Sequence, residues 1–259
     1  MPELPDVEGF RRVLSRHAAG KRIEAVDVLD PSMVKGTRAG PFANALRGKR
    51  FGEPLRHGKW VIAPADGVEA LMHFGMTGLL EWRPPGDERH RHDRVVFVCE
   101  DGELRYRNMR KFGAVRLARD ELERERATGP LGPDADGLDR GTFEQLLARR
   151  RGSIKAAFMD QTLLAGVGNL LADEILWRAR VDPRTPVPRL SRRRRDRLHE
   201  ALSDTIRESL PTERVPHLEG WLTRVRDQRD PRCPRCGARL RKATVAGRTA
   251  CWCPRCQRL

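Results

Sequence analysis

The sequence predicts an α+β protein in which a β-sandwich comes first and helices follow. Three observations support this class. Short apolar runs separated by Gly, Pro and Asp fill the first half, apolar residues at helical spacing fill the second, and five of the six cysteines crowd near the end. Strands followed by helices are typical of α+β folds or of separate domains. We expect a sandwich domain over residues 1–125, a helical domain over 126–221 and a metal-binding hairpin over 222–259.

The composition favours a polyanionic partner. The chain of 259 residues carries 51 Lys+Arg against 36 Asp+Glu, a formal net charge of +15. A large positive excess on a chain rich in both signs suits nucleic acid. A membrane surface would fit the same charge, but no apolar run reaches the roughly 18 residues of a membrane span. The N-terminus also lacks the pattern of a secretory signal.

One short helix and seven strands are predicted before residue 119. Asp6 can cap the helix, which places Val7, Phe10 and Leu14 on one face. The strand candidates read RIEAVDVL, KWVIA, VEALMHF, GLLEW, RVVFVCE, ELRYRN and FGAVRLA. Asp101-Gly102 between two of these runs signals a hairpin, so a sandwich or barrel is expected.

From residue 119 onward the pattern becomes helical. The charged, Gly-, Pro- and Asp-rich stretch 119–141 predicts a short helix and then an interdomain linker. Thr142 and Gln145 form a capping-box pattern before the next helix. Ser191 can cap a long helix whose shared face carries Leu198, Leu202, Ile206 and Leu210. Between them, residues 154–183 predict two helical segments joined by a glycine turn.

The cysteines near the end have the spacing of a zinc site. The motif C-x2-C-x16-C-x2-C is formed by Cys233, Cys236, Cys253 and Cys256. Four thiolates close a tetrahedral shell, so the one Zn²⁺ is structural. Two redox dithiols are the alternative, and the clustering indicates a reducing compartment. Cys251 is a spare with poorer spacing, and Cys99 lies in a predicted strand as a core thiol.

The glycine turn AGVGN at 165–169 is a candidate anion-binding element. It would place Gly166 and Gly168 before a helix that begins near Asn169, where unpaired N–H groups can face an anion. A plain turn between helices explains the same residues. Arg150 and Lys155 upstream favour an element that binds a phosphate backbone.

Taken together, these motifs resemble the formamidopyrimidine-DNA glycosylase and endonuclease VIII family of base-excision repair enzymes. The resemblance runs in order through PELPDVE, HFGMTG (73–78), MRKFGA (109–114), DQTLLAGVGN and GRTACWCPRCQ. It is closer to the formamidopyrimidine branch. It implies a β-sandwich, a helix-two-turns-helix domain and a zinc finger, with damaged double-stranded DNA as partner, no nucleotide cofactor and a monomer acting in the cytoplasm on the nucleoid.

The resemblance gives Pro2 and Glu3 the central chemical roles. Once Met1 is removed, Pro2 presents an α-amine, a group with a reference pKa near ~8 against ~10.4 for lysine. This amine would attack C1′ of the damaged nucleotide, form a Schiff base and allow β,δ-elimination. Glu3 would transfer protons to the opening sugar. Lys59 would contact phosphate and assist β-elimination, and Arg248 would clamp the phosphates beside the lesion.

The resemblance also implies DNA contacts. Met76, Arg110 and Phe112 match the family's trio of side chains that fill the gap left by a flipped nucleotide. For Met76 and Phe112, burial in the sandwich core is the alternative. His92 matches a further DNA contact, while His73 is equally well explained as a structural residue.

Two departures from the family pattern bear on specificity. Asn108-Met109 stands where the family usually has Asp-Pro, so the loop lacks its rigid proline and the preference for the opposite base can differ. The segment 210–231 is short where the family carries a loop over 8-oxoguanine. An oxidised-pyrimidine or hydantoin specialist with the same chemistry, and a non-catalytic zinc-finger DNA-binding protein, are the alternatives.

Overall fold

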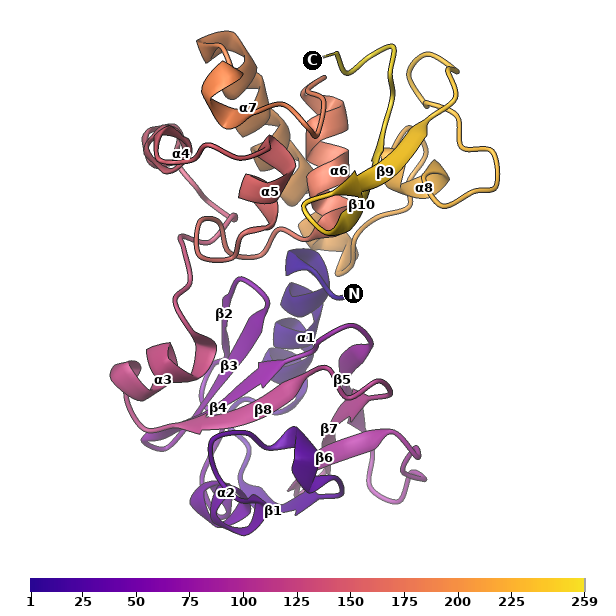
Figure 1. Cartoon of the computed structure of the whole chain (residues 1–259). Helices are drawn as coiled ribbons and strands as arrows, with labels where there is room; N and C mark the ends of the chain where they lie inside the picture. The colour runs from indigo at the N-terminus through magenta and orange to yellow at the C-terminus, as the bar shows by residue number, and fades with distance from the viewer. Residues whose placement is uncertain (259) are drawn as a thin grey trace. The chain divides into compact units, whose positions relative to one another are not determined.

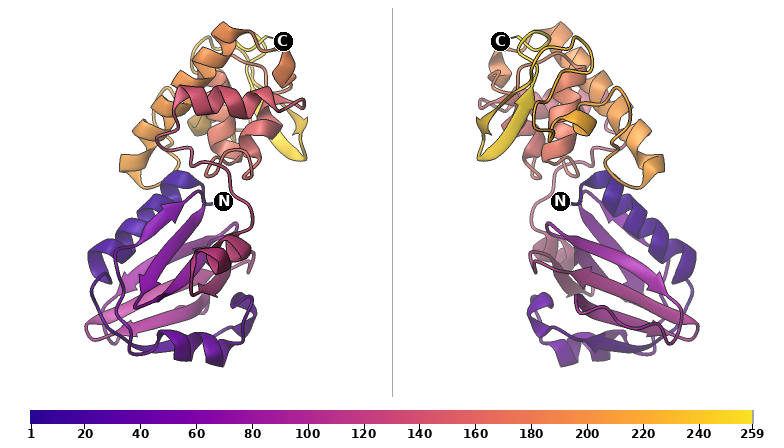
Figure 2. Two further views of the ribbon diagram at one scale, coloured as in Figure 1. Left: turned by 90° about the vertical axis from the view of Figure 1, so that its left-hand side faces the viewer. Right: turned by 90° about the vertical axis from the view of Figure 1, so that its right-hand side faces the viewer.

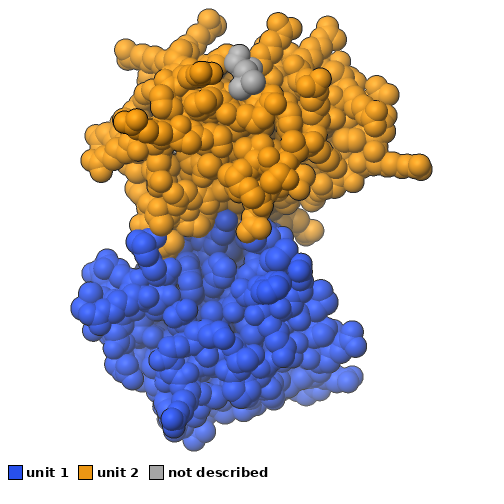
Figure 3. Space-filling model, viewed as in Figure 1, with its two compact units in different colours: residues 1–2, 6–130 blue, residues 3–5, 131–259 orange. Residues whose placement is uncertain are grey.

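The computed structural model describes residues 1–258, which form two compact units. Unit 1 contains residues 1–2 and 6–130, and unit 2 contains residues 3–5 and the chain from Leu131 (Figure 3). Residues 3–5 are therefore part of the second unit, although the residues on both sides of them in sequence belong to the first. No helix within the described residues is long and apolar enough to cross a membrane.

Unit 1 is a β-sandwich, as predicted (Figures 1 and 2). One four-stranded sheet has the order β1-β6-β7-β5 and the other β2-β3-β4-β8, and the pairs within both are antiparallel. The strands are β1 (Ile23–Val28), β2 (Leu55–His57), β3 (Trp60–Ala65), β4 (Val68–His73), β5 (Gly78–Arg83), β6 (Asp93–Cys99), β7 (Gly102–Asn108) and β8 (Ala114–Ala118). All seven predicted strands are present. The three-residue β2 was missed.

The predicted hairpin joins β6 to β7, where Cys99 pairs with Gly102 across a two-residue turn. Cys99 is 3% exposed, as expected of a core thiol. Three helices complete unit 1: α1 (Leu4–His17), α2 (Ala39–Leu46) and α3 (Glu121–Thr128), with a 3₁₀ turn η1 (Pro31–Met33). Because α1 begins at Leu4, Asp6 lies in its first turn, so its predicted role as the cap is wrong.

Unit 2 contains helices and one hairpin. The elements are α4 (Arg140–Ala148), α5 (Ile154–Met159), α6 (Asn169–Arg178), η2 (Val187–Arg189), α7 (Arg192–Ser209), η3 (Leu210–Thr212), α8 (Leu222–Val225), β9 (Arg241–Val245) and β10 (Arg248–Trp252). One apolar core contains residues of α4, α5, α6 and α7, and a smaller cluster contains Trp177, Leu222, Leu240 and the cysteines of residues 233–256.

Two predicted helix caps have different outcomes. Ser191 caps α7 by accepting a hydrogen bond from the Arg194 N–H, as predicted. The Thr142 capping box is wrong, because α4 begins earlier and Asp139 is its cap. Thr142 instead donates its N–H and hydroxyl to the Asp139 carboxylate, at 2.9 and 2.6 Å.

Candidate functional site

The Glu3 carboxylate lies at the N-terminus of α6. Its oxygens accept hydrogen bonds from the backbone N–H groups of Gly168 (3.0 Å), Leu170 (2.8 Å) and Leu171 (3.0 Å). The side chain is 1% exposed. The positive end of the helix dipole and three donors therefore hold one carboxylate in one orientation.

The glycine turn makes room for this carboxylate. A Cβ on Gly168 would lie 2.3 Å from Glu3 Cδ, and Gly166 has φ +105°, where a Cβ would lie 2.6 Å from Leu4. The Leu4 N–H also donates to the Gly166 carbonyl at 3.1 Å. AGVGN is thus an anion-binding turn, but the anion that it binds is Glu3 and not a phosphate. Those N–H groups are already used.

Gln161 holds the glycine turn through hydrogen bonds to its backbone, a role that was not predicted from the sequence. Its amide oxygen accepts from the Gly166 N–H at 3.1 Å, and its amide nitrogen donates to the Val167 carbonyl at 2.8 Å. Asn169, the first residue of α6, is half-buried, and its side-chain oxygen is buried without a hydrogen-bond partner. A glutamine ahead of a two-glycine turn is the only signal that could have indicated Gln161.

Lys155 is buried in unit 2, although the sequence suggested that it contacts the phosphate backbone. Its side chain is 0% exposed, and its ammonium donates to the Asp173 carboxylate at 2.6 Å and to the Thr249 carbonyl at 3.0 Å. The other Asp173 oxygen accepts from the Cys251 N–H at 3.0 Å and from Arg226 at 2.9 Å. This placement corrects the predicted phosphate contact, because a fully buried ammonium cannot reach solvent. Lys155 instead ties α5 and α6 to the hairpin.

Arg150 lies at the surface in an ion pair with Asp160, at 2.7 Å. Its guanidinium also donates to the Thr162 hydroxyl at 3.4 Å. The pair is partly exposed and weak, so it leaves the cation available to a phosphate.

In unit 1, two loops bring Met76, Arg110 and Phe112 to the surface. Met76 is 41% exposed and Phe112 59% exposed, so these two are not core residues. The Arg110 guanidinium lies 5.1 Å from the centre of the Phe112 ring, and its backbone N–H donates to the Thr77 hydroxyl at 3.2 Å. The loops meet closely: a Cβ on Gly75 would lie 2.4 Å from the Phe112 carbonyl carbon.

Lys59 and two histidines complete the predicted residues of unit 1. Lys59 is half-buried in the turn between β2 and β3. Burial, followed by the charges of Lys59 and Arg116, lowers the pKa of His73 to about 4. His92 is half-buried and contacts Arg94 through Nδ1 at 3.1 Å. Partial loss of hydration and the charges of Arg91 and Arg94 lower the pKa of His92.

The four predicted cysteine ligands converge. Their Sγ atoms all lie within 4.8 Å of one another, with 3.5 Å between Cys236 and Cys253 and 4.0 Å between Cys233 and Cys256. Tetrahedral Zn–S bonds of about 2.3 Å require S···S separations of about 3.8 Å, so the set fits Zn²⁺. Cys251 is buried and is not part of this set. Arg248 is exposed and begins β10, directly after the turn of the hairpin.

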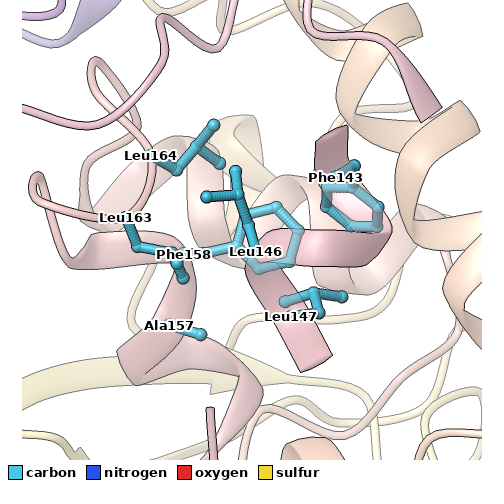
Figure 4. A pocket seen from close by; sticks show the side chains of 7 residues that line it. All are labelled: Phe143, Leu146, Leu147, Ala157, Phe158, Leu163 and Leu164. Atoms are coloured by element: carbon cyan, nitrogen blue, oxygen red, sulfur yellow. The ribbon is translucent and has the colours of Figure 1, made fainter. Parts of the chain in front are cut away.

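The apolar pocket of unit 2 is not a substrate site. Its volume is about 10 Å³, which is room for no more than one water molecule (Figure 4). The lining is entirely apolar: Phe143, Leu146, Leu147, Ala157, Phe158, Leu163 and Leu164.

Comparison with known proteins decides the family. The formamidopyrimidine-DNA glycosylase N-terminal domain matches residues 1–115, its H2TH domain matches 131–216, and the zinc finger found in FPG and IleRS matches 231–259. The formamidopyrimidine-DNA glycosylase of Salinispora tropica is 38% identical over 99% of this chain and 96% of its own. The chain belongs to the formamidopyrimidine-DNA glycosylase family.

Further relatives agree over the full length. The formamidopyrimidine-DNA glycosylase of Streptomyces avermitilis is 36% identical over 100% of this chain and 98% of its own. The crystal structure of Lactococcus lactis Fpg with N7-benzyl-Fapy-dG DNA has a TM-score of 0.90 at 28% identity and covers 100% of both chains. The protein is therefore a DNA glycosylase and AP lyase of base-excision repair, and it has a four-cysteine zinc finger.

Proposed function

We propose that this glycosylase excises an oxidised base from double-stranded DNA through a covalent bond to Pro2. The observation that carries the proposal is the placement of Glu3. Three N–H groups fix its carboxylate, and a single peptide bond joins Glu3 to Pro2. A proton-transferring group is thus held beside the nucleophile by the backbone of α6.

The reaction begins after Met1 has been removed. The Pro2 nitrogen attacks C1′, the glycosidic bond breaks, and the base leaves with a proton taken from solvent. The Glu3 carboxylate takes the remaining proton from the Pro2 nitrogen. The sugar ring then opens, with Glu3 supplying a proton to O4′, and the nitrogen and C1′ form an iminium ion. Loss of a proton from C2′ expels the 3′ phosphate, and a second elimination expels the 5′ phosphate. Water finally releases Pro2.

The remaining residues bind and deform the DNA. Met76, Arg110 and Phe112 enter the space of the flipped nucleotide; their exposure and the contact between Arg110 and Phe112 support this role. Five further polar side chains contact the DNA phosphates: Lys59, Arg248, His92, Arg150 and Asn169. The zinc ion holds the β9–β10 hairpin that carries Arg248, and it takes no part in the chemistry. The working form is a monomer on the nucleoid.

Borohydride trapping tests the covalent step. The mature protein, incubated with abasic duplex and sodium borohydride, should form a stable cross-link, and Pro2→Gly should cross-link at least 10-fold less. Mass spectrometry of the active protein should show that Met1 is absent. A protein that shifts the mobility of the duplex but never cross-links would be a non-catalytic zinc-finger binder, and the proposal would fail.

Excision rates on a panel of duplexes, each with a different damaged base, identify the preferred lesion. We propose an oxidised purine as the first substrate, and dihydrouracil and hydantoin duplexes measure the alternative preference. Faster excision of dihydrouracil than of 8-oxoguanine and formamidopyrimidine would assign the pyrimidine specialist. The same panel with each base opposite the lesion measures the effect of Asn108-Met109.

A further inference from the structure

A second group of arginines lies in unit 2, apart from the start of α6. Arg180 follows the last turn of α6, and Arg193, Arg194 and Arg197 lie in the first two turns of α7; we call these four residues the α7 arginine patch. Helix α6 has ten residues at about 1.5 Å each, so about 15 Å separates Arg180 from the Glu3-bound start of that helix. α7 packs against α6 within the unit (Figures 1 and 2).

The charges of Arg180, Arg193 and Arg194 act on the guanidinium group of Arg197, and few carboxylates compensate them. Arg193 and Arg194 precede Arg197 by four and three residues, so the three lie on one face of α7. None of the four arginines forms an ion pair with a carboxylate within residues 1–258, whereas the neighbouring Arg195 pairs with Glu144. Partial burial, then the charges of Arg193, Arg194 and Arg180, lower the pKa of Arg197, and Glu200 opposes them.

Three further features at the patch lower the stability of the fold. The first turn of α7 contains no acidic residue, so its arginines lie at the positive end of the helix dipole. Arg180 has φ +58°, a left-handed conformation that glycine adopts far more easily. Arg197 Nε is buried without a hydrogen-bond partner. These features all weaken the fold, and a bound polyanion would offset the repulsion between the arginines and their unfavourable interaction with the helix dipole.

The composition of the patch selects DNA over an acidic protein. Protein interfaces centre on buried apolar and aromatic side chains. No large apolar side chain between residues 179 and 200 is exposed, so such a centre is missing here. Guanidinium groups bind phosphate oxygens in pairs and need no apolar support.

We propose that the α7 arginine patch binds the phosphate backbone of a second DNA segment while the lesion-bearing duplex is bound elsewhere on the protein. One molecule can then hold two segments at once and pass from one to the other without dissociating. Because the contact is to phosphate, it is independent of sequence and of damage.

The test uses the full chain with its zinc, saturated with a short duplex that contains a non-cleavable abasic analogue. A fluorescent undamaged duplex is then added, and its binding is followed by anisotropy between 50 and 200 mM salt, with sedimentation used to count the duplexes on each protein. The triple variant Arg193→Gln, Arg194→Gln, Arg197→Gln should weaken this second binding at least 10-fold and reduce the salt slope by about 2.7, at about 0.9 for each lost phosphate contact. In a separate assay, excision from a short duplex that carries an oxidised base should not change.

Two further variants separate loss of charge from loss of folding. Arg180→Gly removes a charge and relaxes the backbone, so it should raise the melting temperature while it weakens second-duplex binding. The control Arg83→Gln, Arg119→Gln, Arg207→Gln removes three exposed arginines that have acidic partners, and it should leave that binding within about twofold. Equal effects of the two triple variants, or a wild-type protein that holds one duplex only, would overturn the proposal. So would binding of an acidic protein at the patch without DNA.

Discussion

The starts of α6 and α7 lie in the same unit, but their free backbone N–H groups find hydrogen-bond acceptors in different ways. Both leave N–H groups without a helical partner. At α6 the cap residue is Gly168, which has no side chain, and the acceptor is Glu3, 165 residues away in sequence. At α7 the acceptor is Ser191, the cap residue itself, and arginines fill the first turn.

The difference separates a functional helix start from a structural one. The α6 start holds a carboxylate beside the residue that we propose as the nucleophile, and its glycines leave space for that carboxylate. The α7 start is capped locally and carries cations against its dipole. Changes at α6 should therefore alter both chemistry and stability, whereas changes at α7 should alter stability and leave excision intact.

Glu3→Ala should produce the largest effect. Three buried N–H groups would lose a charged acceptor, which should destabilise unit 2 by about 3 kcal/mol, and excision should be lost. Urea unfolding and a single-turnover excision assay measure the two effects. Glu53→Ala, at a side chain that is 64% exposed, is the control and should change neither. An active and stable Glu3→Ala protein would show that the α6 start is no different from that of α7.

Gly168→Ala should come next. Its Cβ would lie 2.3 Å from Glu3 Cδ, so the carboxylate has to move. We expect a loss of about 2 kcal/mol in unfolding free energy and excision reduced at least 10-fold. Gly152→Ala is the matched control, because its Cβ would meet nothing within 4 Å. Equal behaviour of the two alanine variants would contradict the role of the turn.

Ser191→Ala should have a moderate effect on stability alone. Loss of the cap should cost about 1 kcal/mol, and excision should stay within twofold of wild type. Ser191→Asp keeps an acceptor and should restore stability. Thermal denaturation measures the first effect, and a defect in excision by a folded Ser191→Ala protein would remove the distinction between the two helix starts.

Arg193→Glu should have the smallest effect, and it should be stabilising. An acidic residue in the first turn interacts favourably with the helix dipole, which should add about 0.5 kcal/mol. Arg207→Glu, in the last turn of the same helix, should destabilise because it reverses the sign and removes the ion pair with Asp204. Urea unfolding of both variants measures whether the free energy of unfolding rises for Arg193→Glu and falls for Arg207→Glu.

Much of the architecture followed from local patterns. Each strand of the sandwich except β2 has an apolar run bounded by turn residues, and β2 has only three residues, too few for such a pattern. The four zinc ligands were predicted because two C-x2-C turns can meet only at one ion. The cap of α4 was misplaced by three residues because Asp139 and Thr142 are both good caps, and the sequence does not rank them.

The site was predicted less completely. AGVGN was correctly read as an anion-binding turn, but its anion was assumed to come from DNA. Lys155 was read as a surface cation because nothing near it in sequence shows that Asp173 and Thr249 would surround it. Gln161 and Arg226 were missed for the same reason, since both act through partners on other segments of the chain.

The sequence by itself determined the order of strands, helices and hairpin, the zinc ligands and the family. These depend on residue spacing within short segments, where periodicity and turn chemistry operate. Only the tertiary structure decided which carboxylate occupies the start of α6, that Lys155 is buried, and that the charge of Arg180, after α6, acts on Arg197 of α7. Those outcomes depend on which distant segments pack together, because burial and Coulomb interactions act through space and not along the chain.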